Sequence, residues 1–292
     1  MQMQVRTQRM TKDRSNEMAR TSPAAPPPRS STAEGHSSRQ VPSWVLSTFS
    51  VLCLIALWAG VSMSGILPAG YLPTPAEMAD EIQLMLRDGY KHVSIWTHIE
   101  ISLFRTLSGF FIAVLIGVPL GLLTGSSRVA GAWIAPIMAF VRPIPPIAFI
   151  PMVVLYFGLG EVGKVVLITW TAFTYVHVNA HAGAANVPIS YMRAAKSLGL
   201  TRRQIFFRIV LFSAIPQIFT GLKVAMALSW AVVVAAELTG AQSGLGYMIS
   251  DAALIFRIPV VFIGIVVIGA IGLLLNFIIN IVESHFVHWR GR

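Results

Sequence analysis

Long apolar runs are the feature of this sequence that most limits what it can fold into. The last run, residues 258–282, contains no Asp, Glu, Lys or Arg. A helix crosses the hydrocarbon core of a bilayer with about 20 apolar residues, and spanning backbone must satisfy its own hydrogen bonds. The whole chain is 55% hydrophobic and 12% charged, whereas soluble domains carry about 25% charged residues. The sequence therefore predicts an all-α integral membrane protein.

Six transmembrane helices are predicted from the apolar runs. Their ranges are 44–67, 107–125, 130–157, 163–184, 215–238 and 258–282. Six spans place the two basic termini and a basic loop, 185–213, on one side, and the mildly acidic segment 68–98 on the other. Since basic loops stay in the cytoplasm, this predicts a multi-pass protein with both termini cytoplasmic.

Residues 1–43 differ from the rest of the chain. They are polar and rich in Pro, Ser and Arg, and they are predicted to form a disordered basic cytoplasmic tail ahead of a membrane domain, 44–292. The net charge of +10 comes from this tail and from short loops, which indicates topology and not nucleic-acid binding. Cys53 is the only cysteine, so there is no disulfide framework and no Cys-based metal site.

The segment Ser190–Gln217 organises the chain. Tyr191, Ala195 and Leu198 have the spacing of one helix face, Gly199 can end that helix, and Thr201 can cap a second helix. The segment carries five basic residues and no acidic one; these are Arg193, Lys196, Arg202, Arg203 and Arg208. Two basic helices meeting at a glycine form a surface that can dock into a partner. The alternative is a loop that follows the positive-inside bias and contacts lipid headgroups.

The third predicted span is interrupted by Arg142, Pro143, Pro145 and Pro146. Broken helices within a membrane need protein or a water-filled cavity around the freed backbone. Arg142 is expected to face the bundle interior or an interface, or else to reach the headgroups beside a simple kink.

Several polar patterns suggest chemistry that the sequence context does not support. Gly158, Gly160 and Gly163 spell a nucleotide-binding pattern, but a membrane span follows where a soluble βαβ unit is required. They are expected to form the outer turn between spans three and four. His177 and His181 have metal-binding spacing without a third ligand nearby, so no metal is predicted. No arrangement of catalytic groups is predicted either.

Glu237 lies near the end of the fifth span, where an unpaired carboxylate is costly. It is expected either to line a pathway or outer gate, or to be structural, paired with an Arg or hydrogen-bonded to the loop at Gln242 and Ser243.

The 190–217 segment resembles the cytoplasmic coupling loop of the ABC-importer permeases, with Ala194, Ala195 and Gly199 followed by Ile209 and Leu211. Arg193 replaces the usual Glu, and Phe212 replaces the usual Pro. Three further stretches resemble the taurine, sulfonate, nitrate and bicarbonate branch; they are residues 142–146, 157–161 and 235–238 with 244–246. The resemblance covers the chain from residue 44 onward.

This resemblance implies the type I importer fold and two groups of site residues. The ATPase-coupling residues would be Tyr191, Arg193, Ala194, Ala195, Ser197, Leu198, Gly199 and Arg202. The translocation-pathway residues would be Arg142, Pro143, Pro145, Pro146, Trp230 and Glu237.

The same resemblance implies a set of partners: a second copy of the chain, two ATP-binding subunits that hold ATP and Mg, and an extracytoplasmic substrate-binding protein, all at a bacterial inner membrane. The chain itself would bind no cofactor and hydrolyse no ATP. The substrate would be taurine or another sulfonate; nitrate, bicarbonate or an organic acid is the alternative, and an intramembrane enzyme or a passive channel is a remote one.

Overall fold

The structure, a computed structural model, describes residues 42–66, 68 and 70–287, and all regular elements within these ranges are helices. The helices are α2 (Ser43–Met63), α3 (Pro75–Asp88), α4 (Ile95–Ser126), α5 (Arg128–Val141), η1 (Pro146–Phe149), α6 (Ile150–Phe157), α7 (Glu161–Ala185), α8 (Ile189–Ser197), α9 (Arg202–Ile205), η2 (Phe206–Val210), α10 (Leu211–Leu238), α11 (Leu245–Leu254) and α12 (Ile258–Phe286). This agrees with the predicted all-α class. The tail predicted over 1–43 lies almost wholly outside the described residues, as do the last basic residues of the chain.

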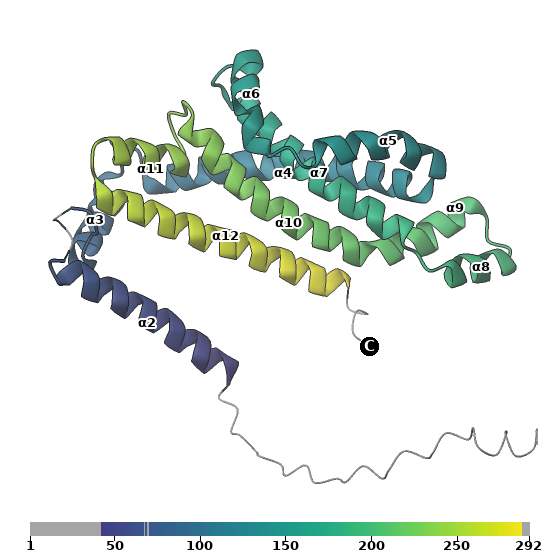
Figure 1. Cartoon of the computed structure of the whole chain (residues 1–292), viewed down its shortest axis with the longest axis horizontal. Helices are drawn as coiled ribbons and strands as arrows, with labels where there is room; N and C mark the ends of the chain where they lie inside the picture. The colour runs from purple at the N-terminus through teal and green to yellow at the C-terminus, as the bar shows by residue number, and fades with distance from the viewer. Residues whose placement is uncertain (1–41, 67, 69, 288–292) are drawn as a thin grey trace, which may run out of the picture. The chain divides into compact units, whose positions relative to one another are not determined.

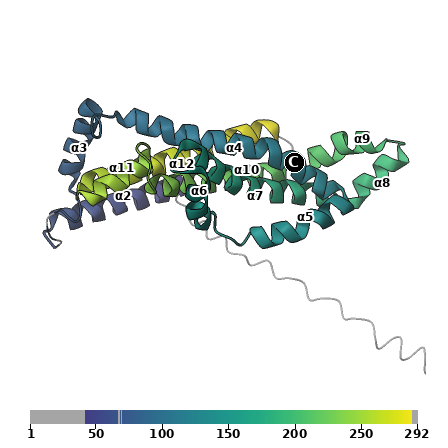
Figure 2. The same ribbon diagram turned by 90° about the horizontal axis from the view of Figure 1, so that it is seen from above.

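The chain divides into two compact units at residue 53, within α2. The arrangement described below lies within residues 54–287, the described part of the second unit. Here α4, α7 and α10 pack side by side, α12 lies along α10, α3 and α11 lie at one end, and α8 and α9 lie at the other (Figures 1 and 2).

Four helical stretches among the described residues are long and apolar enough to cross a membrane: residues 45–63, α4, the continuous run 202–238, and α12. A fifth crossing is counted if α5 and the η1–α6 pair, which meet at an 85° bend, form one broken span. α7 has 25 residues, but it carries Lys164, His177 and other polar side chains and is not among these stretches. The predicted count of six requires α7 as well, so that count stays a prediction.

α4 begins earlier than the apolar run that predicted it. Ser94 caps the helix by accepting a hydrogen bond from the Trp96 N–H, so α4 begins at Ile95 and not near residue 107. Its first turns contain His98, Ser102 and Arg105, which are buried in the bundle. Polar residues are tolerated there because protein, and not lipid, surrounds them.

The glycine stripe of α4 packs against α7. A Cβ atom at Gly121 would lie 2.6 Å from the Ala180 Cβ and 2.7 Å from the His177 carbonyl oxygen, and Gly117 and Gly125 face the same helix. Absence of side chains lets the two backbones approach closely. The glycines at positions 117, 121 and 125 therefore serve packing between α4 and α7 within the chain.

Candidate functional site

The first candidate site is the α8–α9 corner. α8 ends in a Schellman turn, in which the Leu200 N–H donates to the Ala195 carbonyl (3.1 Å) and the Gly199 N–H donates to the Lys196 carbonyl (3.0 Å). Gly199 has φ +73°, a left-handed conformation that costs other residues about 1–2 kcal/mol. The helix therefore ends where the sequence predicts.

The second helix of the corner also begins as predicted. Thr201 caps α9 in a capping box: its side chain accepts from the Gln204 N–H at 3.3 Å, and the Gln204 side chain accepts from the Thr201 N–H at 2.8 Å. α9 then continues without a break through the π-helical turn η2 into α10, so residues 202–238 form one helical run. The corner is therefore joined directly to a membrane helix.

A hydrophobic cluster fastens the corner to the bundle. Ala195 of α8 and Ile205 of α9 are 2% and 6% exposed, and they belong to one cluster with Ala184 of α7 and Ala214 of α10. Because such clusters are close-packed, α8 and α9 are held firmly against α7 and α10.

The opposite face of the corner is exposed. Tyr191 is 57% exposed and Leu198 is 78% exposed. The five basic residues of the segment are exposed too, as are Ala194 and Ser197. Ala195, at the i+4 position from Tyr191 in α8, is buried in the cluster, and Leu198 lies one residue beyond the end of the helix. The exposed face is apolar at Tyr191 and Leu198 and basic around them.

The second candidate site is a buried ion pair at the α3–α11 end of the bundle. Arg105 of α4 donates from Nη1 to Glu237 Oε1 at 2.8 Å, and neither side chain is more than 1% exposed. Ser102 donates to both carboxylate oxygens of Glu237, at 2.8 and 3.0 Å. Arg105 also binds Glu161, at the start of α7, through Nε (2.5 Å) and Nη2 (2.6 Å). One guanidinium group thus joins α4, α7 and α10.

The same group of side chains holds the start of α11. The Gly246 N–H donates to Glu237 (2.9 Å), the Leu245 N–H to Ser102 (2.9 Å), and Arg105 donates to the Ser243 carbonyl (2.8 Å). Gly244 has φ +115°, and a Cβ atom there would lie 2.4 Å from the Glu237 carboxyl group. The surroundings of Glu237 thus fit the structural alternative, in which the carboxylate pairs with an arginine and bonds to the following loop. The arginine is Arg105, and the loop contact is Gly246 in place of Gln242 or Ser243.

The other pathway candidates are divided between surface and interior. Arg142 is exposed at the end of α5, and Pro143 and Pro145 beside it are exposed too, while Pro146 is partly buried. This excludes the interior of this chain's own bundle for Arg142 and leaves an interface or the headgroups. Trp230 is 6% exposed and donates to the Ile268 carbonyl at 3.0 Å. No described contact tests whether Arg142, Trp230 or Glu237 lines a pathway.

α6 stands away from the layer formed by α4, α7 and α10 (Figure 1). Neither α5 nor α6 buries any residue within the chain. An apolar helix in a membrane has to be covered by lipid or by a partner, and both remain open for α5 and α6.

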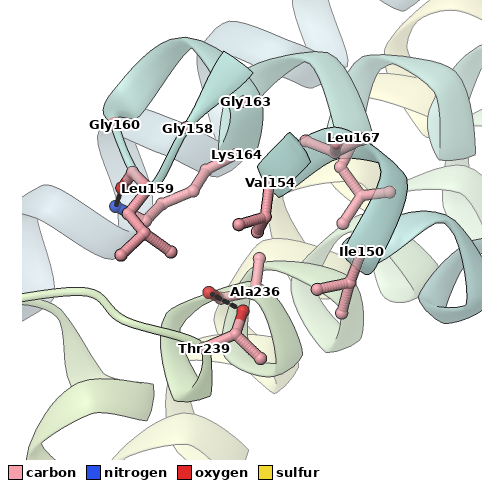
Figure 3. Close-up of a pocket in the computed structure, with 11 residues that line it drawn as sticks. Ile150, Val154, Gly158, Leu159, Gly160, Gly163, Lys164, Leu167, Ala236 and Thr239 are labelled. Carbon is pink, nitrogen blue, oxygen red and sulfur yellow. Dashed lines mark hydrogen bonds between the residues drawn. The ribbon is translucent and has the colours of Figure 1, made fainter. Parts of the chain in front are cut away.

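The glycine-rich turn after α6 does not form a nucleotide site. Gly158 (φ +70°) ends α6 and Gly160 precedes α7, which is the helix-to-helix turn that was expected. The cavity beside them measures only about 20 Å³ and is lined by apolar side chains such as Ile150 and Val154 (Figure 3). Lys164 is occupied there, donating to the Leu159 carbonyl at 3.1 Å. A space of this size holds about one water molecule.

His177 and His181 both contact Thr124, through Nε2 at 3.2 Å and Nδ1 at 3.0 Å respectively. Among the described residues, no three His, Cys, Asp or Glu side chains are grouped as metal ligands. The two rings join α7 to α4.

A charged cluster fastens the α3–α4 loop to α11. Asp251 accepts from the Tyr90 hydroxyl (2.6 Å) and from Lys91 (2.7 Å). The hydrogen bond from Lys91 holds the pKa of Asp251 below its usual range, while burial, together with the bond to Asp251, raises the pKa of Tyr90. Arg257 lies over the Tyr90 ring and pairs with Glu81 of α3.

Comparison with known proteins gives the family. The family model described as "Binding-protein-dependent transport system inner membrane component" matches residues 117–289. The taurine transport system permease protein TauC of Escherichia coli (strain K12) is 34% identical over 255 residues, which cover 87% of this chain and 92% of that protein. The nitrate import permease protein NrtB of Synechocystis sp. is 31% identical and covers 83% and 89%.

A solved structure of the MetNI methionine ABC transporter in an inward-facing conformation has a similar fold. Its matching chain has a TM-score of 0.59 and 20% identity, over 66% of this chain and 97% of that one. The chain therefore belongs to the family of binding-protein-dependent transport system inner membrane components, the permease subunits of ABC importers, whose ATP is hydrolysed by a separate subunit.

Proposed function

We propose that this chain forms, with a second copy of itself, the membrane pathway of an importer for a small sulfonate, with taurine as the first candidate. Two ATP-binding subunits would hold ATP and Mg and dock on the two α8–α9 corners, and an extracytoplasmic binding protein would deliver the substrate. Both termini would face the cytoplasm of a bacterial cell. The observation that carries this proposal is the α8–α9 corner, exposed on one face and packed against α7 and α10 on the other.

The corner supports a mechanical role. ATP-driven closure of the two ATP-binding subunits would displace α8 and α9 as a rigid unit. Since α9 continues into α10 and Ala195 packs in a cluster with Ala184 and Ala214, the membrane helices follow that displacement. The pathway would then switch between inward-facing and outward-facing states.

Sulfonate is favoured by the names of two relatives, the taurine permease above and a putative aliphatic sulfonates transport permease of Bacillus subtilis (strain 168), which is 29% identical over 88% of its length. The names of other relatives favour nitrate or bicarbonate. All of these substrates are small and anionic or zwitterionic.

The proposal is tested by purifying this chain in complex with its ATP-binding subunit. The rate of ATP hydrolysis by the complex is measured with and without the binding protein and taurine. Stimulation by the binding protein loaded with taurine supports the sulfonate importer. Stimulation by nitrate or bicarbonate in place of taurine moves the substrate to that alternative. Failure of any ATP-binding subunit to associate contradicts the role of the corner and reopens the channel and enzyme alternatives.

Replacement of Arg142 by Gln is expected to weaken uptake of an anionic substrate. Arg142 is exposed beside the break between α5 and η1, where a second copy would enclose it. Loss of one charge-assisted hydrogen bond to the anion raises the substrate concentration for half-maximal uptake by about tenfold or more. Uptake of labelled taurine by cells with equal amounts of each variant measures this, with Arg142→Lys as the charge-preserving control. Unchanged uptake and affinity in Arg142→Gln would remove Arg142 from the pathway.

A further inference from the structure

A cavity of about 590 Å³ lies beside the α8–α9 corner, between the α4–α5 turn, α7 and α8. Its lining includes Arg128, Ala132, His181, Val187, Ile189 and Met192. Cavities of about 300–1,000 Å³ are typical of small-ligand sites.

One side of this cavity offers positive charge and hydrogen-bond donors. Arg128 is exposed and has no carboxylate partner among residues 42–66, 68 and 70–287. His181 lies across from the α4–α5 turn, where its Nδ1 contacts the Thr124 hydroxyl at 3.0 Å. No carboxylate lines the cavity. An unpaired guanidinium in such a setting favours an oxyanion.

The other side is apolar. Val187, Ile189 and Met192 line it from the loop before α8 and from α8 itself, and Ala132 lines it from α5. Ile189 is 66% exposed. A ligand that fills both sides has an anionic group attached to a hydrocarbon chain, because a free inorganic anion would leave the apolar wall in contact with water.

We propose that this cavity binds an anionic phospholipid, with its phosphate group at Arg128 and an acyl chain against Ile189 and Met192. The inference rests on the proposed function in one respect, the assignment of the α8 end to the cytoplasmic side. Basic pockets between membrane helices on that side are common sites for anionic lipid headgroups. A lipid held there bridges the α4–α5 turn and α8, and so supports the corner that docks the ATP-binding subunit.

The test is the retention of phospholipid by the full chain, extracted from the membrane and measured by native mass spectrometry. Wild-type protein is expected to retain one anionic phospholipid more than either Arg128→Gln or Ala132→Trp. The first variant removes the guanidinium group, and its lipid affinity should fall about tenfold. The second fills the cavity and leaves Arg128 in place. Arg193→Gln is the matched control, since Arg193 is an exposed basic residue of α8 that does not line the cavity.

Equal retention by all four proteins would overturn the proposal. A second arm adds inorganic phosphate to protein in zwitterionic lipid: thermal stabilisation of the wild type but not of Arg128→Gln, without a difference in retained lipid, would overturn the lipid assignment and identify soluble phosphate as the ligand. Neither arm requires transport or an ATP-binding subunit.

Failure of the proposed topology is detected separately. In a Cys53→Ser background, Ser126→Cys at the α4–α5 turn should resist an impermeant thiol reagent in intact cells and react after permeabilisation. Labelling in intact cells would overturn the cytoplasmic assignment of the α8 end, whatever the outcome of the lipid measurement.

Discussion

Replacing Arg105 with Ala is expected to lower the free energy of unfolding by about 3–5 kcal/mol, the cost of removing one partner from a buried ion pair. The Glu237 carboxylate would remain in a site where its side chain is 0% exposed, with Ser102 and the Gly246 N–H as its remaining described hydrogen-bond donors. The Ser243 carbonyl would lose its donor as well. Thermal and denaturant-induced unfolding of the protein in detergent measures the change.

The control is another Arg→Ala replacement at an exposed site. Arg193→Ala is expected to stay within about 0.5 kcal/mol of the wild type, because surface substitutions without special contacts have small effects. If Arg105→Ala unfolds at the same denaturant concentration as Arg193→Ala, the ion pair does not hold the α3–α11 end together.

A double replacement distinguishes the loss of the whole ion pair from the effect of leaving one buried charge without a partner. Arg105→Met combined with Glu237→Met removes both charges, and it is expected to be more stable than Arg105→Ala, because no buried charge is left without a partner. The pairing of Arg105 with the exposed Glu161 contributes less than its pairing with Glu237, since solvent screens an exposed carboxylate. Glu161→Gln should accordingly cost less than Glu237→Gln.

Sequence reasoning identified the elements whose signals are local. Gly199 and Thr201 end one helix and begin the next through contacts within a few residues, so the corner could be predicted from residue types alone. The interruption between α5 and α6 was predicted for the same reason, since prolines act on their own backbone. The apolar run over residues 258–282 lies wholly within α12.

The partner of Glu237 could not be found in this way. Arg105 lies 132 positions earlier in the chain, and it falls outside the apolar run that was used to define the second span. Two features of the sequence could have pointed to Arg105. It follows Ser102 by about one helical turn, and Ser94 is an N-cap residue that would have extended the predicted helix back to include both. Which of several buried polar side chains meet across helices depends on how α4, α7 and α10 pack, and residue spacing does not determine that.

The burial of Ala195 could not be predicted for a related reason. Helical spacing makes Tyr191 and Ala195 neighbours on α8, but it does not determine which of the two packs against the bundle. The small side chain at Ala195 lets α8 approach the cluster with Ile205 and Ala214. The exposed face proposed to dock the ATP-binding subunit therefore includes Tyr191, Leu198 and the surrounding basic residues, and Ala195 is buried beneath it.

Replacing Gly199 with Trp is expected to leave the protein inserted in the membrane but to abolish its coupling to ATP hydrolysis. A Cβ atom at Gly199 would meet no atom within 4 Å, and the residue is exposed, so we expect the fold to tolerate the larger side chain, although φ +73° adds about 1–2 kcal/mol of strain. The indole ring would project beside Leu198, on the face proposed to dock the ATP-binding subunit. We expect stimulation of ATP hydrolysis by the loaded binding protein, and uptake, to fall to background.

Gly158→Trp is the matched control for backbone strain. Gly158 has φ +70° and equally open space around its Cβ position, but it lies in the turn between α6 and α7. Both variants should therefore lose similar stability, whereas only Gly199→Trp should lose association with the ATP-binding subunit, measured by co-purification at equal expression. If both variants lose association with the ATP-binding subunit equally, the loss results from backbone strain and not from the position of Gly199 at the corner. If a well-expressed Gly199→Trp protein takes up substrate normally, the corner does not carry the coupling, and the route from ATP to α10 has to be sought elsewhere on the surface of the chain.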